Sequence, residues 1–224
     1  MKKFKKALVL FLCAVLLVAG SVMGTLAYLT SQDTVVNTFT VGNVQIKLDE
    51  AEVNADGTYK TNHDSRVDGN KYHLLPGHTY IKDPTVTVLA NSEECYVRMK
   101  VKVTNLINLE AAIPQADNAG FYGAGGVFLL QNLVGDWHSE IWNFEGFTRV
   151  GNDGVYEFRY ATKLPKVAEN TVLNDLFQTI TVPGSIDNDH LAYLEGVTIT
   201  VTAEAIQADG FANTDAAWTA FDAE

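Results

Sequence analysis

The sequence predicts an all-β fold with a few short helices, arranged as an antiparallel two-sheet β-sandwich of the jelly-roll kind. The first observation is a period-two alternation of apolar and polar residues, which is typical of strands with one buried face. It is clearest in three segments: Asn43–Asp49, Tyr96–Thr104 and Val197–Ala205. The second is that turn residues separate the strands at short intervals, without the helices that parallel β-α-β units need.

The remaining elements follow from shorter signals. The last alternating segment, Val197–Ala205, is the longest, and its β-branched residues favour a pleated surface. Three shorter apolar or aromatic segments predict further strands: Pro84–Leu89, Val155–Tyr160 and Leu176–Val182. The turn before the second of these is marked by Asn152-Asp153-Gly154. Short helices are predicted at Asn105–Ala112, Asn170–Leu176 and Thr214–Phe221.

Residues 105–150 form an irregular insertion in this pattern. Within them, 114–147 shows no clear period, and a Gly-Ala-Gly-Gly cluster at 123–126 precedes Trp137 and Trp142. This stretch predicts either two strands around a loop or an insertion that carries a surface function. We expect both tryptophans in the core, because burial is the commonest use of aromatic side chains.

The first 27 residues have the three parts of a secretory signal peptide. Four lysines lie within residues 2–6, an apolar run follows at 7–20, and small residues end the segment. We place the cut between Ala27 and Tyr28, which leaves a single β-sandwich domain of residues 28–224. The alternative is an uncleaved anchor, because apolar residues at 22–29 extend the run towards the roughly 20 residues of a membrane span.

The charge of the exported chain excludes one class of partner. Four of the 16 basic residues lie in the signal peptide, so twelve basic and 27 acidic side chains remain, a formal net charge of −15. Such a domain is a poor ligand for nucleic acid. It retains one cysteine, Cys95, so an internal disulfide cannot hold the fold together.

No segment predicts a catalytic residue, a cofactor or a metal ligand. The five histidines lie in turn-rich segments and lack the paired helical spacing of zinc peptidases: His63, His73, His78, His138 and His190. Cys95 follows Glu93 and Glu94, whose charges raise the pKa of a thiol and disfavour a nucleophilic role. Paired carboxylates that are distant in sequence stay open.

Several segments carry a resemblance to a known family. Near the N-terminus they are Gly24–Thr30 (GTLAYLT), Asn37–Val44 (NTFTVGNV) and Leu48–Glu50 (LDE). Further along the chain they are Asp83–Val86, Tyr96–Val101, Leu176–Phe177, Val182–Pro183, Ala203–Phe211 and Ala217–Trp218. In these segments the chain resembles the TasA, CalY and camelysin family, whereas residues 105–150 match nothing in it.

The resemblance implies a secreted, jelly-roll-like subunit of extracellular fibres in a biofilm matrix, or a protein held at the cell surface. It implies a SipW-type signal peptidase for processing, membrane contact only before cleavage, and copies of itself or a related matrix subunit as partners. In that family the segment after the cut is given to the next subunit as an additional strand. The matching segment is Tyr28–Val41, with the apolar residues Val35, Val36, Phe39 and Val41.

Three alternatives stay open. Residues 28–41 would instead be the first strand of their own domain. The family name also brings a surface metallopeptidase, since camelysin is described as one, although the usual zinc-ligand spacing is missing. The last alternative is a monomeric adhesin or binding module, with 114–147 as its site.

Overall fold

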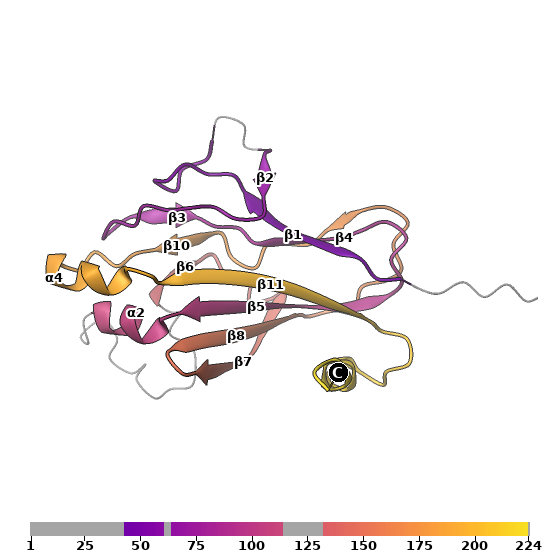
Figure 1. Cartoon of the computed structure of the whole chain (residues 1–224). Helices are drawn as coiled ribbons and strands as arrows, with labels where there is room; N and C mark the ends of the chain where they lie inside the picture. The colour runs from indigo at the N-terminus through magenta and orange to yellow at the C-terminus, as the bar shows by residue number, and fades with distance from the viewer. Residues whose placement is uncertain (1–42, 61–63, 114–131, 224) are drawn as a thin grey trace, which may run out of the picture. The chain divides into compact units, whose positions relative to one another are not determined.

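Antiparallel strands make up most of the computed structural model, which describes residues 43–60, 64–113 and 132–223 (Figure 1). Gly42–Glu224 belong to one compact unit. The strands pair into three sheets, and helices are few and short. The all-β prediction is therefore confirmed, with the difference that three sheets take the place of two.

The largest sheet forms one layer of the sandwich. In spatial order its strands are β11 (Thr198–Gln207), β5 (Cys95–Thr104), β8 (Asp153–Tyr160) and β7 (Trp142–Val150). β11 and β5 are in register from Thr198 opposite Thr104 to Gln207 opposite Cys95. The inward residues of β5 are at most 1% exposed, as the alternation predicts: Val97, Met99, Val101 and Val103.

Two smaller sheets form the facing layer. One has the order β2 (Arg66–Val67), β1 (Ile46–Ala51), β4 (Thr85–Val88) and β9 (Thr171–Val172). The other has the order β3 (Thr79–Ile81), β10 (Thr179–Thr181) and β6 (Val134–Gly135). One hydrophobic cluster contains residues from all three sheets, so the core lies between the two layers.

The irregular stretch contributes an aromatic part of this core. Trp142 begins β7, is fully buried, and donates its indole N–H to the carbonyl oxygen of Asn174 at 3.0 Å. Its prediction as a core residue is confirmed. Trp137 is half-buried, and its ring meets that of Phe158 edge-on with centroids 6.0 Å apart. Residues 114–131 lie outside the described part of the chain.

Two of the three predicted helices are present. They are α2 (Leu106–Ala112) and α5 (Thr214–Phe221). The helix predicted at 170–176 is wrong, because this segment is extended along β4: the N–H groups of Leu173 and Leu176 donate to the carbonyls of Val86 and Pro84. The strand predicted at 176–182 is shorter in the structure, where only Thr179–Thr181 form a strand, β10.

A helical turn that the sequence analysis missed follows Asp187. It consists of α4 (Asn188–Leu191) and the short 3-10 helix η1 (Ala192–Leu194). The Asp187 carboxylate accepts hydrogen bonds from the N–H groups of Asp189 and His190, which is the N-cap arrangement that stabilises a helix start. These helices lie beside α2 at one end of the domain (Figure 1).

Several predictions concern residues outside the described part. They are the signal peptide with its cut between Ala27 and Tyr28, the donor segment 28–41, and the loop position of His63. Among the described residues, no helix combines the length and the apolar character of a membrane span.

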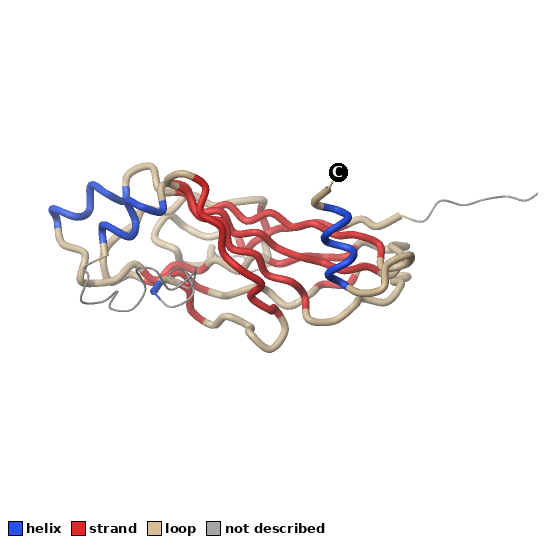
Figure 2. Tube along the Cα trace, turned by 90° about the horizontal axis from the view of Figure 1, so that it is seen from below, coloured by secondary structure: helices blue, strands red, loops and turns tan. Residues whose placement is uncertain are grey.

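Helix α5 crosses the outer face of the large sheet (Figure 2), where it covers Arg98 of β5. The guanidinium lies 4.3 Å from the centre of the Trp218 ring and pairs with Glu204 of β11 and Asp222 at the end of α5. Arg98 is consequently fully buried although it lies on the polar face of its strand. This cluster attaches the C-terminal helix to the sheet.

The Arg98 cluster makes stability dependent on acid. Hydrogen bonds from Arg98 lower the pKa of Asp222 below its ordinary value. A carboxylate whose pKa is lowered by folding contributes stability above the unfolded pKa of about 3.9, and the contribution disappears as the pH falls through the lower folded pKa. We therefore expect Asp222→Asn to be less stable than the wild type at pH 7, and to lose less stability between pH 5 and pH 2.

Urea unfolding at several pH values tests this expectation. The control is Asp209→Asn, because Asp209 is exposed and lies outside the cluster. An Asp222→Asn variant that follows the wild-type curve at every pH would show that this ion pair does not hold α5.

Candidate functional site

An apolar groove of about 620 Å³ lies between the two layers in the described part of the chain. Its two long sides are the edges of different sheets, β1 on one side and β11 on the other. Among the described strands, β11 pairs only with β5, and residues 46–49 of β1 pair only with β4. Two open strand edges therefore face one another across the groove.

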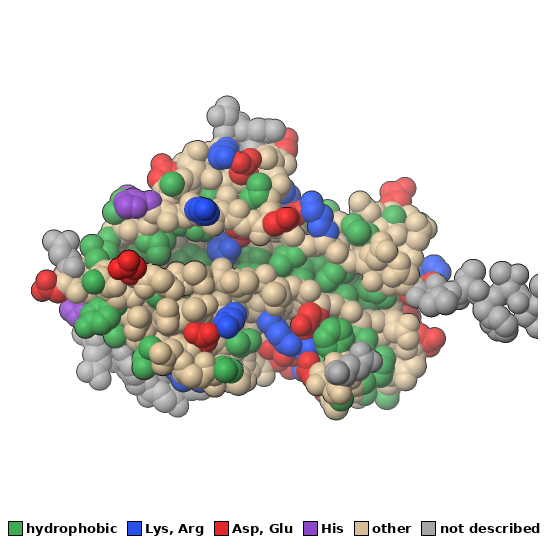
Figure 3. All heavy atoms as spheres, viewed as in Figure 1, with side chains coloured by type: hydrophobic (Ala, Val, Ile, Leu, Met, Phe, Trp, Pro, Cys, Tyr) green, Lys and Arg blue, Asp and Glu red, His purple; other side chains and the backbone are tan. Residues whose placement is uncertain are grey.

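The groove is a place where the core is incompletely covered. On β11, Ile199 and Val201 point inward but are only half-buried, whereas their partners Val103 and Val101 on β5 are fully buried. Leu48 of β1 is half-buried as well. Hydrophobic side chains accordingly lie at the bottom of a hollow that follows β11 across the molecule (Figure 3).

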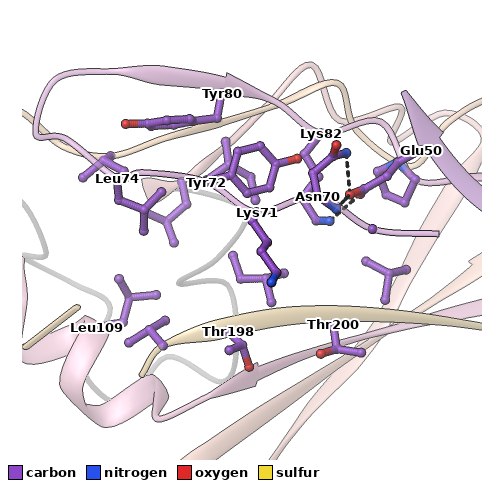
Figure 4. Close-up of a pocket in the computed structure, with 18 of the residues that line it drawn as sticks. Glu50, Asn70, Lys71, Tyr72, Leu74, Tyr80, Lys82, Leu109, Thr198 and Thr200 are labelled. Carbon is purple, nitrogen blue, oxygen red and sulfur yellow. Dashed lines mark hydrogen bonds and ion pairs between the residues drawn. The ribbon is translucent and has the colours of Figure 1, made fainter. Parts of the chain in front are cut away.

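Helices and loops complete the walls. Apolar side chains reach the groove from Tyr80 on β3, Ile180 on β10, Leu109 on α2 and Leu194 on η1. Above β11, residues 68–74 form a rim between β2 and β3 (Figure 4). Segments from many parts of the sequence thus meet around one cavity.

Hydrogen bonds and ion pairs fix this rim. Glu50 of β1 pairs with the buried Lys82 and accepts hydrogen bonds from the side chain and the backbone N–H of Asn70, both at 2.9 Å. The side chain of Asn70 also donates to the carbonyl oxygen of Ala51 at 2.8 Å. Tyr72 donates its hydroxyl to the carbonyl of Ile81 at 2.9 Å, and burial, reinforced by the charge of Glu50, raises its pKa. Glu50, Asn70 and Tyr72 therefore tie the rim to β1 and to the end of β3.

Two further acidic residues support the same edge. Asp49 of β1 and Asp83 both pair with Arg66 of β2, and Arg66 Nη1 lies 2.9 Å from Asp83 Oδ2. The other carboxylate oxygen of Asp83 accepts a hydrogen bond from the backbone N–H of Ala51. Burial opposes the ionisation of Asp49, but hydrogen bonds from Arg66 and Lys47 outweigh it and lower the pKa. These acidic side chains therefore anchor β2 to β1 and to the rim.

The four histidines in the described part of the chain do not converge. His73 and His78 are exposed, whereas His138 Nδ1 lies 2.9 Å from Asp175 and His190 Nδ1 lies 2.6 Å from Asp187. Each of the last two meets one carboxylate. Within residues 43–60, 64–113 and 132–223, no group of three His, Cys, Asp or Glu side chains is arranged to hold a metal ion.

Cys95 is fully buried, and burial raises the pKa of its thiol to about 11. The expected direction is confirmed, but the expected cause is not. Glu93 and Glu94 instead form ion pairs with Lys166 at 2.6 Å and Lys163 at 2.8 Å. A buried, protonated thiol is a poor nucleophile.

No protein-family model, curated protein or solved structure matches the chain. What the groove can bind therefore follows from its own residues.

The sequence analysis missed the groove, although it found both strands that border it. The alternation at 43–49 and 197–205 identified the inward residues of β1 and β11. It contained no signal that these strands are sheet edges, because strand order depends on pairing between distant segments. Of the predicted site at 114–147, the structure describes residues 132–147, which contain β6 and the first part of β7. Among these described residues, Leu133 lines the groove and the others do not.

Proposed function

We propose that the protein is a secreted structural subunit of extracellular fibres in a biofilm matrix, and that each copy accepts the N-terminal segment of another copy as a strand in the groove. The observation that carries this proposal is the pair of facing strand edges whose inward apolar residues are half-buried. A strand added to one of these edges would cover the apolar side chains beside it.

Strand addition provides both affinity and specificity. The outward N–H and C=O groups of an edge strand are available to a new neighbour, and side chains at alternate positions enter the apolar cavity. When the donor segment of one copy lies in the groove of the next, the contact is head-to-tail. A head-to-tail contact that does not close into a ring generates a filament.

The donor that we propose is segment 28–41. Its fourteen residues span about 46 Å when extended, at about 3.3 Å per residue. The ten residues of β11 span about 33 Å by the same measure. The segment is therefore long enough to follow the whole edge of β11, and it offers Val35, Phe39 and Val41 at alternating positions.

Processing has a mechanistic role in this proposal. A segment attached to a membrane-inserted signal peptide cannot enter the groove of a neighbouring copy. A cut between Ala27 and Tyr28 by a SipW-type signal peptidase would release it. Assembly would then be confined to the outside of the cell.

A monomeric binding module is the second candidate. The groove volume of about 620 Å³ falls within the range of ligand pockets, and its lining combines apolar walls with a few polar groups. This candidate expects a monomer at high concentration that binds a specific ligand. The peptidase alternative has no grouping of described residues in its favour.

Two proteins test the proposal, one beginning at Tyr28 and one beginning at Gly42. We expect filaments only from the first, measured by negative-stain microscopy and light scattering across pH and salt. We expect the second to be a folded monomer, because each described strand pairs with another described strand. A synthetic 28–41 peptide should bind that monomer, and a scrambled peptide should not. Filaments from the shorter protein would overturn strand donation.

A further inference from the structure

One cation of the described domain lacks an ionic partner. Every lysine and arginine in the described part of the chain forms an ion pair with a carboxylate, except Lys71. In a chain with so large an excess of acidic residues, an unpaired lysine is unusual. Its position gives a reason.

Lys71 lies on the rim of the groove and reaches into it. Figure 4 shows its side chain pointing from the rim towards β11, between Thr198 and Thr200. The preceding residue, Asn70, is fixed by its hydrogen bonds to Glu50 and Ala51, so the backbone that carries Lys71 has a defined place. The ammonium group is exposed and available to an occupant of the groove.

Two acidic groups beside the groove are neutralised, because Glu50 pairs with Lys82, and Asp49 pairs with Arg66 and Lys47. Asp68 on the same rim is exposed and forms no ion pair with a described lysine or arginine. The cation that the groove offers above its apolar floor is therefore that of Lys71. Its complement is a strand with an apolar inner face and one negative charge.

The segment that we propose as donor has this composition. Asp33 is the only charged residue in 28–41. Because side chains of a strand alternate between its two faces, Asp33 shares a face with Val35, Asn37, Phe39 and Val41, whereas Thr34, Val36, Thr38 and Thr40 lie on the other. The face with Val35, Phe39 and Val41 would be turned to the groove, and the carboxylate would lie at one end of the same face.

We propose that Asp33 of one copy pairs with Lys71 of the next and fixes the register of the donated strand. This inference rests on the proposed function. A slip of one residue is already disfavoured, since it turns the apolar face outward. A slip of two residues keeps that face inward, but it places Ser31 or Val35 at Lys71 and loses the ion pair. The ion pair thus excludes the slips that hydrophobic burial tolerates.

Charge exchange in the whole exported chain, beginning at Tyr28, tests this register. We expect Asp33→Lys and Lys71→Glu each to raise the protein concentration needed for assembly by on the order of tenfold, the effect of replacing an attraction with a repulsion at a partly buried site. The doubly exchanged chain should assemble like the wild type. Circular dichroism checks that each variant is folded.

Mixing the two single variants provides a second measurement. Each contact in an alternating filament then joins opposite charges, so the mixture should assemble at concentrations where neither variant does alone. The difference in assembly concentration between the mixture and the single variants should decrease at high salt, where exposed charges are screened.

The outcomes separate the two proposals. Single variants that assemble like the wild type would overturn the register while strand donation remains. A wild type that forms no filaments overturns both. The wild type could also stay monomeric while either single variant melts at a lower temperature than the wild type does. This result would place residues 28–41 in the groove of their own copy and overturn the exchange between copies.

Discussion

Replacing Val201 with glutamate is expected to abolish filament formation while leaving the domain folded. Val201 points into the groove from β11 and is only half-buried, so the new carboxylate remains hydrated in the free subunit. A donated strand would cover it. Burial of a carboxylate without a partner costs at least about 3 kcal/mol, which lowers the affinity for the strand more than a hundredfold.

The neighbouring residue supplies a matched control. Thr202 is exposed on the opposite face of the same strand, beside Lys100 in the register of β11 with β5, and it does not line the groove. Thr202→Glu adds the same charge outside the groove and should assemble normally. Light scattering and microscopy measure assembly, and thermal unfolding confirms that both variants are folded. Normal filaments from Val201→Glu would exclude a strand that lies on the inward face of β11.

The strands that the sequence predicts best are those in which alternation is uninterrupted. β5 and β11 are recognised because their inward positions are apolar along ten residues. β7 is not recognised, because its register with β8 shifts between Phe144 and Gly146. Such an irregularity moves the following side chains out of the simple period. Local pattern therefore predicts regular strands and fails at a bulge.

The groove depends on information that local pattern does not contain. Leu48, Tyr80, Ile180 and Ile199 line one cavity, although they come from four distant segments. The sequence shows that each is apolar. It does not show that β1 and β11 are the open edges, which follows from the order of the strands in each sheet. Nor does the sequence show that Lys71 lacks an ionic partner or that it lies beside the groove.

Arg98 illustrates the opposite error. Its position on the polar face of an alternating strand predicts an exposed side chain. In the structure Arg98 is fully buried, because Trp218 and Phe221 of α5 cover it, with ring centres 4.3 and 5.1 Å from the guanidinium. A helix that begins more than a hundred residues later converts a surface position into part of the interior.

The second large effect is expected at this residue, where Arg98→Ala should lower the free energy of unfolding by about 3 kcal/mol. The substitution removes the partner of Glu204 and Asp222 together with the stacking contact with Trp218. The loss lies at the lower end for a broken buried pair, because the remaining carboxylates are partly exposed and become hydrated. Urea unfolding measures it, and faster hydrogen exchange in α5 would show that the helix is released.

Arg159→Ala is the matched control for that loss. Arg159 is the register partner of Arg98 on β8 and also meets several carboxylates, among them Glu157 and Asp215. The side chain of Arg159 is 17% exposed, whereas the side chain of Arg98 is fully buried. Because ion pairs near the surface contribute at most about 1 kcal/mol, the control should remain close to the wild type. Equal losses in the two variants would mean that burial of the guanidinium beneath α5 adds nothing to the stability.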